Sequence, residues 1–309
     1  MTTGRAPAGA LTDFAARLSL RLDDFQRRAC AALAAGHGVL VCAPTGAGKT
    51  IVGEFAVHLA LASGTKCFYT TPIKALSNQK FHDLVAIHGA GNVGLLTGDN
   101  SINADAPIVV MTTEVVRNMI YAESSALDGL SYVVMDEVHF LADRFRGAVW
   151  EEVIIHLPLE VRLIALSATV SNAEEFGDWL DTVRGGGADE PAVEVIVSET
   201  RPVPLEQHVL VRGDLLPLFD DRAGIATAQV NQELMRIRGG SGARYENNRQ
   251  AQPFRSQGGY DAVRKRPPRG GRRPVRSSNM QRIERLDRPQ VVQLLERANL
   301  LPAIFFIFS

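Results

Sequence analysis

Short apolar runs alternate with amphipathic segments over the first two hundred residues of the chain. Each run is four or five residues long and predicts a buried strand, and the intervening segments carry apolar residues at helical spacing. Strands separated by helices form a parallel sheet that is covered on both faces. The pattern therefore predicts an α/β fold, with strands over 39–42, 66–70, 93–96, 108–112, 132–135 and 162–166 and helices over 50–63, 74–87, 114–122, 149–156 and 173–181.

The composition is that of an ordinary globular protein. The chain has 309 residues, of which 46% are hydrophobic and 22% charged, which suggests about two domains and a substantial core. Its three cysteines form no CxxC pair and indicate small apolar residues in a reducing compartment. The N-terminus lacks a signal-peptide pattern, and the apolar run at 303–308 is too short to span a membrane. We therefore expect a cytoplasmic protein with no membrane contact.

The net charge of −1 conceals a strongly basic segment over 236–282. This segment holds 13 Lys and Arg residues against two acidic ones, which gives a net charge of +11. It is rich in Gly, Pro, Ser, Asn and Gln and nearly free of aliphatic residues, so it cannot bury a core. We expect a disordered insertion, which is either a solvated linker or an arm that holds a nucleic-acid backbone through counterion release.

A glycine-rich segment, APTGAGKT, begins at Ala43 between a predicted strand and a predicted helix. Gly46 and Gly48 let the backbone turn so that its N–H groups face inward, as a bound phosphate requires. Lys49 can reach the outer phosphates, and the hydroxyl of Thr50 can bind Mg²⁺. Ala43 stands where this pattern usually has Gly, but the neighbouring strand and helix supply the helix N-terminus that phosphates need. The segment predicts a nucleotide site formed by Thr45, Gly46, Ala47, Gly48, Lys49 and Thr50.

A second motif, Asp136-Glu137-Val138-His139, ends a later apolar run. Asp136 supplies a carboxylate for a metal ion, and Glu137 supplies one that activates water. A lone Asp-Glu pair after an apolar run is usually a solvated strand end, but this pair follows a phosphate cradle in the same chain. Because the carboxyl ends of parallel strands meet at one edge of a sheet, we expect the two motifs to lie together. The residues predicted at that edge are Lys49, Thr50, Asp136, Glu137 and Ser167.

An ordered set of motifs resembles the first motor domain of a superfamily two DExH-box helicase. Two further stretches, at 140–152 and 201–206, resemble the exosome-associated RNA helicases and their bacterial HelY-type relatives. The resemblance is close over 18–211 and looser over 284–309. The motifs are LDDFQ at 22–26, APTGAGKT at 43–50, TPIKALSNQK at 71–80, LTGD at 96–99, MTTE at 111–114, DEVH at 136–139 and SAT at 167–169.

The resemblance implies a RecA-like P-loop domain that binds ATP and Mg²⁺. Gln26 would read the adenine, although an exposed helix glutamine is the simpler interpretation of that residue alone. Lys49 and Thr50 would hold the phosphates and Mg²⁺. Asp136 would bind Mg²⁺ through water, and Glu137 would orient and deprotonate the attacking water. The implied catalytic residues are therefore Lys49, Asp136 and Glu137.

The resemblance also implies three residues that couple the nucleotide site to strand movement. His139 would link the nucleotide to the second motor domain, although a lone His after a strand is more often structural. Ser167 and Thr169 would form a hydroxyl pair that couples hydrolysis to movement. A Ser-x-Thr sequence is common, so this assignment depends on the order of the motifs.

Three segments are implied to hold the backbone of a nucleic acid. Small polar residues and N–H groups at helix N-termini suit phosphates and read no base sequence. The same residue types also serve as helix caps, and one residue can fill both roles. The implied contacts are Pro72, Lys74 and Gln79 in the first segment, Thr97, Gly98 and Asp99 in the second, and Thr113, Glu114 and Arg117 in the third.

The chain is expected to stop soon after the start of a second motor domain. A helix over 289–298 precedes an apolar run at 304–308 that resembles the first strand of that domain. The arginine finger of the second domain would then be missing, and such a finger contributes about 10³–10⁵ in rate. We expect an incomplete helicase with weak or no turnover. Its expected parts are a flexible N-terminus over 1–17, a first RecA-like domain over 18–211, a linker with the basic insertion over 212–288 and the start of a second RecA-like domain over 289–309.

Three functions remain open at this stage. The first is the ATP-binding domain of an RNA helicase that acts on single-stranded or partly duplex RNA, with the rest of the helicase and an RNA-degradation complex as partners. The second is a DNA-repair helicase of the same superfamily, whose motor motifs would look almost the same. The third is a nucleotide-binding module without catalysis. An intact Lys49, Asp136 and Glu137 argue against this third function.

Overall fold

The computed structural model describes residues 9–19, 21–144, 146–169, 172–187, 191–211, 213–219, 229–236 and 287–307. The chain divides into two compact units, Met1–Pro204 and Leu205–Ser309. This boundary lies earlier than the expected domain end at residue 211. The reason is that strand β9 (His208–Val211) pairs with strand β10 (Asp214–Pro217) inside the second unit.

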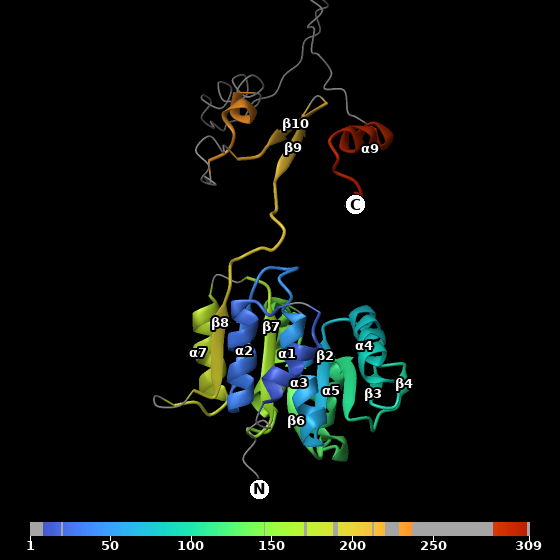
Figure 1. Ribbon diagram of the computed structural model, residues 1–309, viewed down its shortest axis with the longest axis vertical. Coiled ribbons are helices and arrows are strands. Elements are labelled where there is room, and N and C mark those ends of the chain that lie inside the picture. The colour runs from blue at the N-terminus through green and yellow to red at the C-terminus, as the bar shows by residue number, and fades with distance from the viewer. Residues whose placement is uncertain are drawn as a thin grey trace, which may run out of the picture. The chain divides into compact units, whose positions relative to one another are not determined.

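An eight-stranded sheet forms the centre of the first unit (Figure 1). Its strands are β1 (Gly38–Cys42), β2 (Lys66–Thr71), β3 (Val93–Leu96), β4 (Ser101–Ile102), β5 (Ile108–Thr112), β6 (Leu130–Met135), β7 (Arg162–Ser167) and β8 (Val193–Val197). Their order is β4-β3-β5-β2-β6-β7-β1-β8, and β4 is antiparallel to β3 whereas all the other neighbours are parallel. The predicted RecA-like parallel sheet is confirmed. The edge strands β4 and β8 were not predicted.

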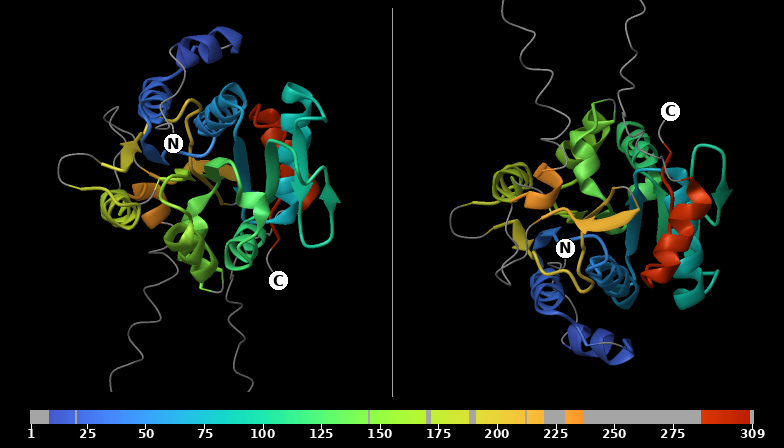
Figure 2. Two further views of the ribbon diagram at one scale, coloured as in Figure 1. Left: turned by 90° about the horizontal axis from the view of Figure 1, so that it is seen from below. Right: turned by 90° about the horizontal axis from the view of Figure 1, so that it is seen from above.

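Helices cover both faces of this sheet (Figure 2). They are α1 (Ala10–Arg17), α2 (Asp24–Ala35), α3 (Thr50–Ser63), α4 (Lys74–His88), α5 (Thr113–Tyr121), α6 (Gly147–His156) and α7 (Ala173–Val183), with 3-10 turns η1 (Ser125–Leu127) and η2 (Val138–Ala142). Helices α1 to α4 pack on one face, and α5 to α7 pack on the other. Along β1, Val39 and Val41 point to the first face and Leu40 and Cys42 to the second, as strand geometry requires.

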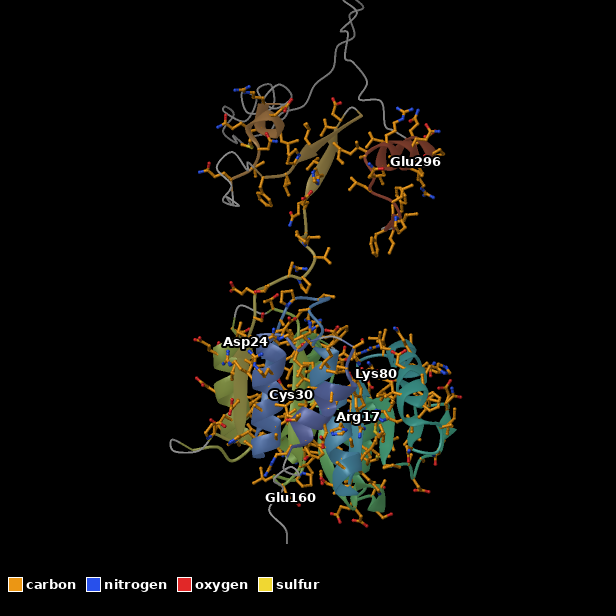
Figure 3. All side chains as sticks on the ribbon, in the orientation of Figure 1. Arg17, Asp24, Cys30, Lys80, Glu160 and Glu296 are labelled. Atoms are coloured by element: carbon orange, nitrogen blue, oxygen red, sulfur yellow. The ribbon has the colours of Figure 1, made fainter. Side chains whose placement is uncertain are left out.

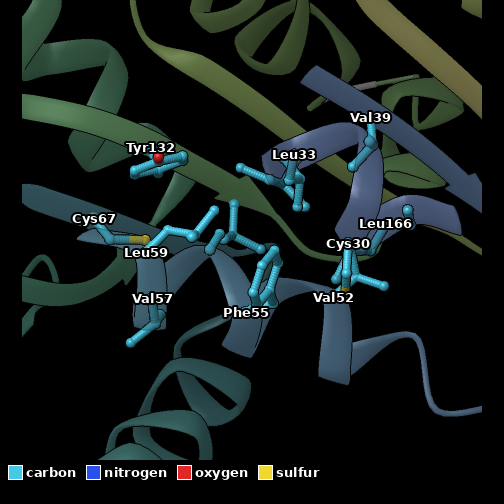
Figure 4. Packing of buried hydrophobic residues seen from close by; sticks show 14 of the residues in the cluster. Cys30, Leu33, Val39, Val52, Phe55, Val57, Leu59, Cys67, Tyr132 and Leu166 are labelled. Carbon is cyan, nitrogen blue, oxygen red and sulfur yellow. The ribbon is translucent and has the colours of Figure 1, made fainter. Parts of the chain in front are cut away.

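The core on the first face is made largely of aliphatic side chains from α2, α3 and the sheet (Figure 4). Leu33, Phe55 and Leu166 are almost completely buried there. Cys30 lies in the same cluster, and burial raises the pKa of its thiol to about 12. Cys30, Cys42 and Cys67 are all free and buried, which agrees with the expected role as small apolar residues.

The expectation of a flexible segment over residues 1–17 is wrong for residues 10–17, which form α1. Phe14 of this helix packs on Phe55 of α3, with 5.1 Å between the ring centroids, and on His58, at 5.5 Å. Ala10 and Phe14 are buried, so the helix is held by an apolar face that spans one turn. Burial and the nearby charge of Arg17 lower the pKa of His58. The helix therefore docks through a neutral imidazole.

The second unit contains the β9–β10 hairpin, a helical turn over 232–236 and helix α9 (Arg288–Arg297). Helix α9 matches the helix predicted over 289–298 and begins with a capping box between Asp287 and Gln290. The strand predicted at 304–308 is not found over residues 304–307. Ile304 is 82% exposed and Phe306 is 76% exposed, because no described strand pairs with this run.

The basic segment over 236–282 lies outside the described residues except for Arg236, so its expected disorder stays a prediction. Among the helices that the structure describes, none has the length and apolar character needed to cross a membrane.

Candidate functional site

Strands β6, β7 and β1 are neighbours in the sheet and run parallel, so their carboxyl ends meet at one edge. The glycine-rich loop follows β1, the Asp136-Glu137 pair follows β6, and Ser167 ends β7. Cys42 of β1 lies in register with Ser167. The structure thus brings the two nucleotide motifs and the predicted coupling segment to the edge where open parallel sheets bind ligands.

The glycine-rich loop has the backbone conformation that a phosphate cradle needs. Gly46 and Gly48 both have φ of +85°, a left-handed conformation that side chains with a Cβ rarely adopt. Thr45 and Gly46 are exposed, whereas Ala47 is buried. Thr50 is the first residue of α3, so the loop leads directly into a helix N-terminus.

Lys49 is folded back into the loop. Its Nζ donates to the carbonyl oxygens of Ala43 at 2.8 Å and Pro44 at 3.2 Å, and the residue is only 8% exposed. Burial lowers the pKa of Lys49, while the charges of Glu137 and Asp136 oppose this shift. The ammonium group is therefore desolvated and interacts with both carboxylates of the second motif.

Gln26 connects α2 to the glycine-rich loop. Its side-chain oxygen accepts from the backbone N–H of Asp23 at 2.8 Å, which forms half of a capping box. Its Nε2 donates to the backbone oxygens of Gly48 at 3.0 Å and Ala47 at 3.4 Å. A Cβ on residue 48 would lie 2.7 Å from this nitrogen, so Gly48 also makes room for Gln26. The residue is 3% exposed, which contradicts the interpretation as an exposed helix glutamine.

The Asp136 carboxylate is held on both sides. Its Oδ1 accepts from the backbone N–H of Glu137 at 3.0 Å, and its Oδ2 accepts from the hydroxyl of Tyr69 at 3.0 Å. Glu137 has φ of +58°, which is uncommon for a residue with a side chain and frequent at functional sites. Sequence reasoning did not predict Tyr69, because its contact with Asp136 spans 67 positions along the chain.

Glu137 and His139 lie close together without a well-aligned hydrogen bond. His139 Nδ1 is 3.3 Å from Glu137 Oε2, yet both atoms are buried and lack a hydrogen-bond partner among the described residues. Buried polar atoms normally have partners, so this pair fits a site that takes up a polar ligand or water. With the phosphate cradle and the Asp136 carboxylate, the arrangement fits a nucleotide bound with Mg²⁺.

The predicted coupling hydroxyls differ in their surroundings. Ser167 is 1% exposed at the end of β7, and its carbonyl oxygen accepts from the N–H of Ala43 at 3.2 Å. Thr169 is exposed, two residues beyond the strand. The structure therefore places Ser167 against the glycine-rich loop and leaves Thr169 accessible.

The first two predicted nucleic-acid segments are joined by an ion pair. Lys74 at the start of α4 pairs with Asp99 in the loop between β3 and β4. The hydroxyl of Thr97 donates to the other carboxylate oxygen of Asp99 at 3.1 Å. The bonds from Lys74 and Thr97 lower the pKa of Asp99. Both Lys74 and Asp99 are largely exposed, and so are Gln79 and Gly98.

Two of the residues predicted to contact nucleic acid interact instead with other residues of the chain. Pro72 is buried, and its carbonyl oxygen accepts from Arg146 Nη1 at 3.1 Å. Arg117 lies 3.7 Å from Glu152 and also bonds the side chain of Asn118. Arg146 belongs to the 140–152 stretch and was given no role from sequence alone.

The third segment is only partly accessible. Thr113 is 1% exposed at the start of α5, and its hydroxyl has no hydrogen-bond partner among the described residues. Glu114 is half-buried. These positions agree with a helix N-terminus that can serve a cap or a phosphate.

The chain is similar to known helicases. Residues 23–176 match the family model of the DEAD/DEAH box helicases. The probable helicase HelY of Mycobacterium tuberculosis is 58% identical over 303 residues, which cover 97% of this chain and 30% of that protein. The chloroplastic DExH-box ATP-dependent RNA helicase DExH15 of Arabidopsis thaliana is 40% identical over 311 residues, 94% of this chain and 25% of that protein. The antiviral helicase SKI2 of Saccharomyces cerevisiae is 43% identical over 211 residues, 68% of this chain and 16% of that protein.

The chain thus spans about 30% of the length of the HelY protein and less of the other two relatives. The matched residues 23–176 contain Gln26, the glycine-rich loop, the Asp136-Glu137 pair and Ser167. The resemblance predicted from the order of the motifs is confirmed, and this chain belongs to the DEAD/DEAH box helicase family.

Proposed function

We propose that this chain is the ATP-binding motor domain of an RNA helicase. The observation that carries the proposal is the meeting of two motifs at one sheet edge. A glycine cradle with a buried Lys49 lies near the carboxylates of Asp136 and Glu137, whose charges act on its ammonium group. This combination suits binding of a nucleoside triphosphate with a divalent cation and activation of water.

The nucleotide is proposed to bind in the cradle formed by Thr45, Gly46, Ala47 and Gly48. Lys49 would exchange its carbonyl partners for the outer phosphates, where its charge is better compensated. Thr50 and Asp136 would hold Mg²⁺, which when bound neutralises charge on the phosphates. Gln26 would contact adenine from α2 while it holds the loop.

Hydrolysis is proposed to depend on Glu137. Its Oε2 has no hydrogen-bond partner among the described residues, so it is free to accept a proton from water. His139 Nδ1 lies 3.3 Å from this oxygen, and His139 would link the nucleotide site to a second motor domain. Ser167 and Thr169 would complete the coupling through β7.

RNA is proposed as the nucleic acid, in single-stranded or partly duplex form. The support is that one of the three relatives described above, which is 40% identical over 94% of this chain, is named an RNA helicase. An RNA-degradation complex in the cytoplasm is the proposed setting, together with the rest of the helicase. The predicted contacts are Pro72, Lys74, Gln79, Thr97, Gly98, Asp99, Thr113, Glu114 and Arg117.

Turnover by the 309-residue chain alone is proposed to be weak or absent. The relatives are more than three times as long, and an arginine finger from a second motor domain contributes about 10³–10⁵ in rate in related sites. The described residues of the second unit, which include β9, β10 and α9, form no second sheet of the RecA type.

The proposal is tested by nucleotide binding and ATP turnover of this chain, with and without single-stranded RNA or DNA. We expect Mg²⁺-dependent ATP binding with little turnover, and stimulation by RNA in a chain extended to the length of HelY. Stimulation by DNA alone would favour the DNA-repair alternative. Binding without hydrolysis in the extended chain would favour the non-catalytic module, and a lack of nucleotide binding would overturn the proposal.

The Lys74–Asp99 pair gives a separate prediction about the nucleic-acid interface. If Lys74 meets a phosphate, Lys74→Ala should weaken RNA binding and reduce the slope of log affinity against log salt by roughly 0.7. Asp99→Asn should tighten binding, because it removes the carboxylate that competes with phosphate for Lys74. Fluorescence anisotropy with a labelled oligonucleotide at several salt concentrations measures both effects.

Lys66→Ala is the matched control for this prediction. Lys66 begins β2 at the opposite end of the strand, where its Nζ donates to the carbonyl of Ala126 at 3.1 Å. The slope of log affinity against log salt for Lys66→Ala should equal that of the unmodified chain. An unchanged slope in Lys74→Ala would remove Lys74 from the interface.

A further inference from the structure

Tyr69 is a buried polar residue beside the nucleotide site that no motif includes. It lies in β2, in register with Val134 of β6, one strand away from the residues that follow β6. Its side chain is completely buried, and its hydroxyl donates to Asp136 Oδ2 at 3.0 Å. A buried tyrosine hydroxyl needs a partner, and here the partner is the predicted metal-binding carboxylate.

The tyrosine ring is fixed from two helices. Gly53 of α3 lies so close that a Cβ there would be 3.0 Å from Tyr69 Cε2, so a side chain at this position would press on the ring. Lys80 of α4, which is labelled in Figure 3, places its Nζ 5.3 Å from the centroid of the Tyr69 ring. The same Nζ lies 3.8 Å from Glu54 Oε1 of α3. A cation at this distance from an aromatic ring is attracted to it. The hydroxyl therefore has a single, well-defined direction.

The chemistry of the contact is also unambiguous. A phenol hydroxyl can donate whereas a carboxylate can only accept, so Tyr69 is the donor to Asp136. With the N–H of Glu137 on the other oxygen, each oxygen of the carboxylate accepts one hydrogen bond and keeps lone-pair capacity for a further ligand.

We propose that Tyr69 is a positioning residue that fixes the Asp136 carboxylate in the orientation required for Mg²⁺ and its water shell. The proposal rests on the function proposed above. Mg²⁺ demands near-octahedral geometry and is held by few carboxylates, so it tolerates poor ligand orientation badly. Loss of a partner that orients a metal ligand typically weakens metal affinity by about 10–100-fold.

The test is the Mg²⁺ dependence of nucleotide binding to Tyr69→Phe in the full 309-residue chain. A fluorescent ATP analogue is titrated at a series of Mg²⁺ concentrations, so no turnover is needed. We expect the Mg²⁺ concentration for half-maximal binding to rise by about tenfold, while binding in EDTA is unchanged. Thermal unfolding of the same samples shows whether the variant is folded.

Two further variants separate positioning from packing. Tyr132→Phe removes the hydroxyl of another buried tyrosine, on β6, which makes no described contact with Asp136, and should leave the Mg²⁺ dependence unchanged. Asp136→Asn should itself raise the Mg²⁺ requirement, and adding Tyr69→Phe to it should produce no further shift. Independent, multiplying effects of the two substitutions would show that Tyr69 does not act through Asp136.

The outcomes also distinguish this inference from the proposed function. If the unmodified chain binds nucleotide without any Mg²⁺ dependence, the proposed function fails. If the unmodified chain depends on Mg²⁺ and Tyr69→Phe behaves identically to it, the proposed function stands and the role of Tyr69 is overturned.

Discussion

Replacing Lys49 by alanine should remove nucleotide binding almost completely. The ammonium group is desolvated in the glycine-rich loop, and among the described residues its hydrogen-bond partners are the backbone oxygens of Ala43 and Pro44. Two charge-assisted bonds to phosphate at about 1.5 kcal/mol each correspond to about a hundredfold in affinity. We expect a loss of at least this size for Lys49→Ala.

The loss should be specific to the triphosphate. Adenosine, which lacks phosphates, should bind equally weakly to the variant and to the unmodified chain, whereas ATP should lose its advantage over adenosine. Isothermal titration with both ligands measures this difference, and Lys66→Ala serves as the matched lysine substitution at the other end of the sheet. ATP binding that survives in Lys49→Ala would place the nucleotide elsewhere.

The sheet and both nucleotide motifs could be predicted because their signals are local. The apolar runs at β1, β2, β5, β6 and β7 are uninterrupted, as strands buried on both faces require. The glycine pattern before α3 is likewise contained in eight residues. A pattern that lies within a few consecutive residues and fits only one kind of element therefore predicts that element correctly.

The errors concern elements whose stability comes from distant partners. Helix α1 is short and is held by Phe14 against Phe55, more than forty positions away. Strand β8 is an edge strand in which only Val193 and Ile196 are buried, and it pairs with β1, more than 150 positions earlier. The apolar run at 304–307 shows the converse, because β propensity without a described partner strand produces no strand.

The site residues that the sequence did not predict also depend on partners that are distant along the chain. Tyr69 bonds Asp136, which lies 67 positions away along the chain, and Arg146 bonds Pro72, which lies 74 positions away. Neither lies at a spacing that any chemical motif requires, so their roles follow from the fold alone. The sequence therefore predicts which groups touch the nucleotide better than it predicts which groups orient them.

Arg184 holds the segment that leads from α6 into β7. It is 6% exposed at the end of α7, and its guanidinium donates to four backbone oxygens. The two groups Nη1 and Nη2 bond Leu157 at 2.6 Å, Pro158 at 2.6 Å, Val161 at 2.7 Å and Ile154 at 3.4 Å. Burial lowers the pKa of Arg184 to about 10, so the group remains charged at neutral pH and also compensates the C-terminal dipole of α6.

Replacing Arg184 by alanine should therefore destabilise the first unit by about 3–5 kcal/mol, because three carbonyl oxygens would lose short, charge-assisted bonds at a cost of about 1–3 kcal/mol each. Four carbonyl oxygens would lose a charged donor at once, and a typical domain has only about 5–15 kcal/mol of stability. The free energy of unfolding of Arg184→Lys should lie between that of the unmodified chain and that of Arg184→Ala, since an ammonium group cannot reach four oxygens in a plane. Urea unfolding followed by tryptophan fluorescence measures this loss, because Trp150 and Trp179 lie in α6 and α7, the helices next to the contact.

Arg162→Ala provides the comparison that decides the interpretation. Arg162 reaches the same segment, but through long bonds of 3.5 Å to Leu159 and 3.4 Å to Glu160. Bonds of that length contribute little, so the cost should stay below about 1 kcal/mol. If the two alanine variants lost equal stability, removal of an arginine side chain in general would explain the effect. A difference of several kcal/mol would instead assign it to the three short bonds of Arg184 to Leu157, Pro158 and Val161, which hold the start of β7 and thereby the position of Ser167 at its far end.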